Sequence, residues 1–246
     1  MALFGNKTPL SSLWAKMAAA AVVGVLTVGA LGLFEEYFGS GGSTDVERAM
    51  QAARDAPLIG LVLRENPSLD QGLRAAAEEE IRHPTKRPLP SLQFGARLRA
   101  EYIIPALRNT DDASALAAVR AMEALARHLQ TTDPAMCRDF GVTGIREPAR
   151  LDARAKELLK KALALQEDAY RVGKQAKPRP ALSDNQFVEL LMVAGYKDGD
   201  LERLGKAQSL GVQEACDMTV KLYSAPSSLT PDKGGVLARW LLTVPQ

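Results

Sequence analysis

The sequence has few of the side chains from which most active sites are built. Its 246 residues include two cysteines and two histidines, and aromatic residues make up only 5%. It contains no HExxH, GxSxG, P-loop or dinucleotide-binding motif, and neither cysteine belongs to a CxxC pair. His83 lies in a proline-rich segment and His128 near the end of an expected helix, so both are expected to be structural or solvated. These absences predict a non-enzymatic protein without a cofactor or a metal ion.

Acidic residues form three short groupings, none with the pattern of a catalytic or calcium site. A helical glycan-cleaving enzyme needs a buried glutamate in a cleft lined by aromatic and polar side chains. The scarcity of aromatic residues leaves no such glutamate to nominate. Asp198, Asp200 and Glu202 lack the distal glutamate of an EF-hand loop, while residues 78–80 are interpreted as a solvated helix face and residues 111–112 as a helix start. An envelope hydrolase acting on glycan or lipid is the alternative function.

The sequence also lacks a large excess of charge. Its formal net charge is +2, whereas nucleic-acid-binding proteins usually carry a denser basic surface, so nucleic acid is not an expected partner. Basic residues cluster around two proline-rich segments: Arg82, Lys86, Arg87, Arg97 and Arg99 around the first, and Lys174, Lys177 and Arg179 in the second. If these segments are neighbours, they form a candidate surface for an acidic partner; otherwise each cluster is a solvated face.

One stretch without charge stands out near the beginning of the chain. Residues 17–34 are eighteen consecutive uncharged, mostly apolar residues. As a helix they would be about 27 Å long, close to the thickness of the hydrocarbon core of a bilayer. Trp14 and Lys16 precede the stretch, and two glutamates and Tyr37 follow it. We therefore predict a single transmembrane anchor over residues 17–38, after a short leader over residues 1–16.

The residues that flank the anchor predict its orientation. The leader carries Lys7 and Lys16 and no acid, and positive residues next to a membrane helix stay in the cytoplasm. The rest of the chain is then expected in the periplasm of a bacterium, on the outer side of the inner membrane. The alternative is a signal peptide cleaved after Ala30, which would release a soluble periplasmic binding module. Ala20 and Gly24 form a small-xxx-small pair through which two anchors could associate.

The remainder of the chain reads as a linker followed by one all-α domain. Residues 39–43 (GSGGS) predict a flexible linker, and residues 44–246 predict a bundle-like domain of about eight to ten helices. Residues 131–147, with Pro134, Gly141 and Gly144, are expected to form a long loop. Pro105 is expected to kink or end the helix that starts at Ser91. The expected helices cover 44–56, 57–65, 69–82, 91–104, 111–130, 148–176, 183–195, 200–208, 212–223 and 230–242.

The two cysteines are expected to form a disulfide. Cys137 and Cys216 would both lie in the periplasm, where a cysteine pair is usually oxidised. Free thiols are the alternative.

The expected helix over residues 148–176 carries the most regular apolar pattern of the soluble part. Its seam residues alternate in spacings of four and three, as in a heptad repeat: Leu151, Ala155, Leu158, Ala162, Leu165, Ala169, Val172 and Ala176. Either this helix is the spine on which its neighbours pack, or the seam is a coiled-coil interface between two copies. Leu159, Leu163 and Tyr170 widen the apolar face and favour the spine.

Together these features predict a membrane-anchored periplasmic protein that binds another protein. A subunit of an envelope or secretion complex, a dedicated chaperone and an immunity-type inhibitor all fit this description. The identity of the protein partner does not follow from the sequence.

Overall fold

A computed structural model describes residues 46–83, 89–145 and 147–243 of the protein, and all its regular elements there are helical. The expectation of an all-α domain is therefore confirmed for this part of the chain, although the number of helices is higher than expected. The helices are α3 (Val46–Asp55), α4 (Pro57–Glu65), α5 (Ser68–Arg82), α6 (Pro90–Leu98), α7 (Ile104–Asn109), α8 (Asp112–Thr132), α9 (Pro134–Val142), α10 (Ala153–Gln175), α11 (Asp184–Val193), α12 (Asp198–Gly205), α13 (Val212–Ser224) and α14 (Pro231–Thr243).

The predicted leader, anchor and linker, including Ala20 and Gly24, lie outside the described residues. Among the residues that are described, no helix is both long enough and apolar enough to cross a membrane.

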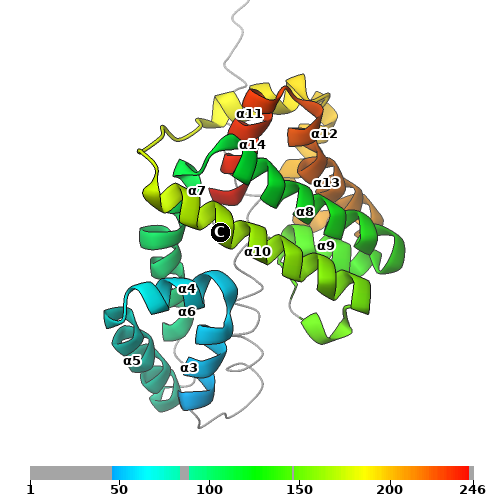
Figure 1. Cartoon of the computed structure of the whole chain (residues 1–246). Coiled ribbons are helices and arrows are strands. Elements are labelled where there is room, and N and C mark those ends of the chain that lie inside the picture. Colours follow the sequence, from blue (N-terminus) through cyan, green and yellow to red (C-terminus); the bar gives the residue numbers. More distant parts are fainter. Residues whose placement is uncertain (1–45, 84–88, 146, 244–246) are drawn as a thin grey trace, which may run out of the picture.

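Two long helices, α8 and α10, pack side by side in the middle of the domain (Figure 1). Helices α3 to α6 gather at one end, where α10 contacts α4. Helices α9, α13 and α14 pack on α8 at the other end, and α11 lies on α14. The apolar core is continuous through the domain, with Met50 and Leu73 at one end and Leu129 and Leu237 at the other.

The predicted seam of α10 packs inside the chain. Ala155, Leu158, Ala162 and Ala169 are buried, and Leu151 is buried just before the helix begins. Towards the end of the helix the pattern fails: Leu165 is half-buried, Val172 is exposed and Ala176 lies beyond α10. An α-helix drifts by about 20° per heptad relative to a repeat of 3.5 residues, so the buried stripe moves onto Gln166, Tyr170 and Gly173. The seam is thus covered by the chain itself and is not open to a coiled-coil partner.

The expected loop over residues 131–147 is wrong for most of its length, because it contains α9. The Asp133 carboxylate caps this helix by accepting a hydrogen bond of 3.0 Å from the Met136 amide, and Pro134 occupies the first helical position, where proline is favoured. Gly141 is tolerated because the helix lies against Thr219, where a Cβ would overlap that side chain. Gly144, with φ of 80°, then ends the helical stretch.

Pro105 does not end its helix. A π-helical turn over Arg99–Ile103 joins α6 to α7, so one continuous rod runs from Pro90 to Asn109. Proline has no amide hydrogen to donate, and the π-turn, a form found mostly as a single turn inside α-helices, ends two residues before Pro105. The start of α12 also differs from expectation: it begins at Asp198, and Asp200 accepts a hydrogen bond of 2.9 Å from the Lys197 amide.

The disulfide is formed as expected. Cys137 of α9 and Cys216 of α13 are bonded, their Cα atoms are 5.2 Å apart, and both residues are fully buried. The bond ties α13 to the helix that the sequence did not predict.

Candidate protein-binding groove

A surface depression lies between α7, the connector over residues 176–183, α11 and α14. It consists of two adjoining cavities of about 480 and 530 Å³. Leu182, Val236 and Arg239 line both cavities. We call this depression the α11–α14 groove. Its apolar floor is formed by Ala100, Ile104, Ala181, Leu182, Leu190, Val236 and Trp240.

Helix α11 forms one wall of the groove and is held in place by local signals and one aromatic contact. Ser183 and Gln186 form a capping box, with the Gln186 amide 3.3 Å from the Ser183 hydroxyl oxygen. The Phe187 ring stacks on Trp240 of α14 at a centroid distance of 3.6 Å. Phe187 and Leu191 are the residues that α11 buries. At its end, Met192 is 44% exposed and Val193, which lines the groove, is 61% exposed.

The polar side of the groove is organised around Asp112, at the start of α8. Its carboxylate pairs with Arg239 of α14 and with Arg179 of the connector, the latter at 3.4 Å. The Arg179 amide also donates a hydrogen bond of 3.0 Å to the Asn109 side-chain oxygen, which fixes the connector against the end of α7. Burial lowers the pKa of the Arg239 guanidinium. These contacts hold the connector and α14 against the same helix start.

The formal charges of the residues that line the groove sum to zero. Four are basic and four are acidic: Arg108, Arg179, Lys233 and Arg239, and Asp112, Asp184, Glu189 and Asp232. A ligand would therefore gain more from apolar contact with the floor than from attraction to one sign of charge.

Among the residues that the structure describes, the two predicted basic clusters do not form one patch. Arg179 contributes to the α11–α14 groove, and Lys174 pairs with Glu65 at 2.7 Å. Arg82 lies at the far end of α5, next to the beginning of α6. The rod from Pro90 to Asn109 has Arg82 near its beginning and Arg179 at its end, and its length of about 30 Å, at 1.5 Å per residue, separates the two.

The other members of the first cluster differ among themselves. The Arg97 guanidinium lies 5.4 Å from the centroid of the Phe94 ring at the surface. Arg99 is buried in the π-turn, and this burial lowers its pKa to about 10. Lys86 and Arg87 lie outside the described residues, while Lys177 is exposed on the connector.

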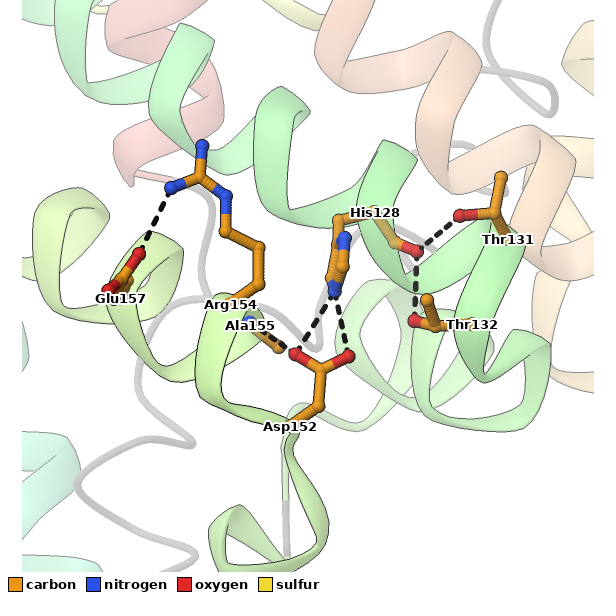
Figure 2. A network of polar contacts seen from close by, with 7 residues as sticks. All are labelled: His128, Thr131, Thr132, Asp152, Arg154, Ala155 and Glu157. Carbon is orange, nitrogen blue, oxygen red and sulfur yellow. Dashed lines mark hydrogen bonds and ion pairs between the residues drawn. The ribbon is translucent and has the colours of Figure 1, made fainter.

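The His128 imidazole faces the carboxylate of Asp152 (Figure 2). Its Nε2 atom lies 2.9 and 3.1 Å from the two carboxylate oxygens of Asp152. Asp152 caps α10 and has a lowered pKa, first because it accepts a hydrogen bond from the Ala155 amide and then because of His128. The nearby hydroxyls of Thr131 and Thr132 donate to the His128 carbonyl oxygen, not to the imidazole. The pair joins the end of α8 to the start of α10, which is a structural role.

One acidic residue contradicts the expected solvated face over residues 78–80. Glu80 is only 5% exposed, because the helical period places it on the same side of α5 as Leu73 and Ala77. Its carboxylate accepts hydrogen bonds from the Ser91 amide and hydroxyl at the start of α6. Glu80 lines neither cavity of the α11–α14 groove, and its carboxylate caps the start of α6. In the described part of the chain, no three His, Cys, Asp or Glu side chains are placed to hold a metal ion.

One feature of the sequence, an apolar run near the end of α11, indicated part of the groove and was not singled out above. Residues 190–193 are four consecutive apolar residues (LLMV) in a helix, and they cannot all face the same side. Leu191 points into the core, whereas Val193 is left at the surface. The partners of Val193 in the groove come from distant segments, so the sequence pattern alone could not locate them.

Comparison with known proteins identifies no relative: no family model, curated protein or solved structure matches this chain.

Proposed function

We propose that this protein is a non-enzymatic, single-pass inner-membrane protein whose periplasmic helical domain, residues 44–246, binds another protein through the α11–α14 groove. The observation that carries the proposal is the groove itself: an apolar floor in two adjoining cavities, next to an exposed apolar end of a helix. Isolated apolar residues are common on protein surfaces, but apolar side chains gathered at a groove mark interaction sites.

The shape of the groove suits an amphipathic helix of the partner. Apolar side chains spaced by three or four residues along such a helix could enter the two cavities in turn, as in other helix-in-groove complexes. The mixed charges at the rim would set the orientation of the helix more than its affinity. The location rests on the uncharged stretch over residues 17–34 and on its flanking charges, and the disulfide agrees with an oxidising compartment.

The test is affinity capture from detergent-solubilised membranes with the full chain and two matched variants. Val193→Asp places a charge at the groove, and Val212→Asp places the same charge at an exposed valine of α13, which lines neither cavity of the groove. Both valines are exposed, so neither variant should disturb folding. We expect Val193→Asp to lose a partner that the unchanged chain and Val212→Asp retain, with affinity reduced at least about tenfold. A partner captured equally by all three forms would show that the groove is not the binding site.

A further inference from the structure

The disulfide between α9 and α13 is enclosed by the packed domain. Cys137 and Cys216 are both fully buried. One turn further along the two helices, a Cβ at Gly141 would overlap the Thr219 side chain, so α9 and α13 touch there. Both helices also pack on α8. The two sulfur atoms are therefore closed to solvent for as long as α9 and α13 stay in place.

The chemistry that makes a disulfide needs space beside a sulfur atom. One cysteine thiolate attacks a sulfur of an oxidant disulfide, which gives a mixed disulfide and releases one oxidant thiol. The second cysteine thiolate then attacks the protein sulfur of the mixed disulfide, and the oxidant leaves as its second thiol. In total the two cysteines lose two protons and two electrons, and the oxidant gains them. Reduction by a thiol runs through the same steps in reverse.

The packed domain has no room for the mixed disulfide. This intermediate carries the oxidant on the Sγ atom of Cys137 or Cys216, and both positions are enclosed. The surroundings also disfavour the attacking thiolate, because Cys137 shares the buried face of α9 with Met136 and Phe140 and an isolated charge is costly among apolar side chains. We propose that an oxidant disulfide makes the Cys137–Cys216 bond before α9 and α13 pack, and that the packed domain neither makes nor exchanges this bond.

This order of events determines which reaction supplies the finished domain. Thiol–disulfide exchange must act on a chain in which α9 and α13 are still apart. With the location proposed above, the chain crosses the membrane before it folds and meets the oxidant in the periplasm, where cysteine pairs are oxidised. A chain that packed in a reducing compartment would keep its two thiols. The proposal concerns the chain alone, so it stands or falls independently of the α11–α14 groove.

Reduction of the finished bond provides the first test. The full chain in detergent is treated with dithiothreitol, and free thiols are trapped over time with a maleimide that shifts the band on a gel. Reduction should be at least about a thousandfold slower than in the chain unfolded by urea, because only the small opened fraction reacts. Gly141→Val, which forces α9 and α13 apart, should speed reduction about 30- to 150-fold, and Gly211→Ala should stay within about twofold. Reduction of the native chain at the rate of the unfolded chain would overturn the proposal, and so would equal rates for the two variants.

A surface thiol on the same helix is the matched control. Val212 begins α13, four residues before Cys216, and is 39% exposed. Val212→Cys should react with the maleimide at once in the native chain. If it reacted as slowly as the buried pair, burial would not be the cause of the protection and the proposal would fail.

The order of oxidation and packing is tested directly by refolding. Reduced chain in urea is diluted either into buffer that contains oxidised glutathione from the start, or into buffer that receives it after a delay. Far-UV circular dichroism shows whether the reduced chain has folded by then. A folded reduced chain should form the bond at least about a hundredfold more slowly than the unfolded chain, and a reduced chain that stays unfolded would also support oxidation before packing. A folded reduced chain that is oxidised as fast as the unfolded one would overturn the proposal.

Discussion

Helices α11 and α13 are both short amphipathic helices in the same half of the domain, yet they are held very differently. Helix α13 buries seven of its residues. It is bonded to α9 through the disulfide and lies against it at Gly141. Helix α11 buries Phe187 and Leu191, and its main support is the stacking of Phe187 on Trp240.

This difference separates scaffold from binding surface. A helix fixed on several sides opens only when the whole domain unfolds, whereas a helix held by two buried side chains can open locally at a smaller cost in free energy. Helix α11 also keeps apolar side chains at the surface, while α13 places nearly all of its own in the core. A wall that can adjust in this way suits the groove that we propose as the binding site.

Removal of the disulfide should have the largest effect of the changes that we predict, and it acts on α13, the more firmly held of the two helices. The bond closes a loop with a sequence separation of 79 residues, so the chain-entropy model predicts that Cys137→Ala with Cys216→Ala lowers the free energy of unfolding by about 4–5 kcal/mol. Urea denaturation measures this loss, and dithiothreitol should produce a similar loss in the unchanged protein. A loss below about 1 kcal/mol would mean that noncovalent packing alone fixes α13.

Gly141→Val should be the next most damaging change. A Cβ at this position would overlap the Thr219 side chain of α13, so α9 and α13 would have to separate. We expect the free energy of unfolding to fall by about 2–3 kcal/mol, as in other overpacked cores. Gly211→Ala is the matched control, because Gly211 caps α13 with a φ of −60° and has no atom within 4 Å of the Cβ position. Equal stability of the two variants would contradict the close contact.

Phe187→Ala should act on α11 alone. The whole-domain stability should fall by about 1–2 kcal/mol, less than the 3–5 kcal/mol typical of a core phenylalanine, because α11 can detach without unfolding the rest. Hydrogen exchange at α13 amides should become faster only by the factor of about 5–30 that this global loss implies, whereas α11 amides should lose most of their protection. Phe140→Ala is the contrast: its ring lies 5.5 Å from that of Tyr223, and its removal should destabilise the whole domain. Uniformly faster exchange in Phe187→Ala would show that α11 belongs to the scaffold.

Local signals allowed several helices of both regions to be predicted closely. Helix α4 begins at Pro57 and α13 begins at Val212, as expected, and Ser183, where the expected helix starts, is the N-cap of α11. Helix α9 was missed because Pro134 and Gly141 were interpreted as loop residues. Proline is favoured at the first helical position, and glycine is needed where another helix approaches closely. These meanings depend on packing that the sequence pattern does not show.

The groove was less predictable than the helices. Its residues come from α7, the connector, α11 and α14, and no periodicity links segments so far apart in the chain. The basic clusters were the reverse case: both were visible in the sequence, but the continuous rod through Pro105 keeps Arg82 and Arg179, which the structure describes, apart. Burial of Glu80 depended in the same way on the Ser91 amide and hydroxyl of another helix. In each case the missing information was tertiary.

The smallest effect on stability that we predict is electrostatic and concerns the contact between α12 and α13. The Asp200 carboxylate on α12 lies 2.7 Å from the Lys221 ammonium on α13, and this contact is the main reason why its pKa is lowered. A carboxylate whose pKa is lower in the folded state stabilises the fold at pH values above its unfolded pKa of about 3.9. The stabilisation is lost as the pH falls through the folded pKa.

Asp200→Asn keeps the shape and the hydrogen-bond acceptor but removes the charge, so it should lower the free energy of unfolding by about 0.5–1 kcal/mol at pH 7. At a pH below the folded-state pKa of Asp200 the two proteins should approach equal stability, because the carboxyl group is then protonated and neutral. Chemical denaturation at the two pH values measures the difference, and Asp184→Asn at the start of α11 is the control on the loosely held side. A difference that persists at low pH would mean that packing of α12, and not the ion pair, supports this edge of α13.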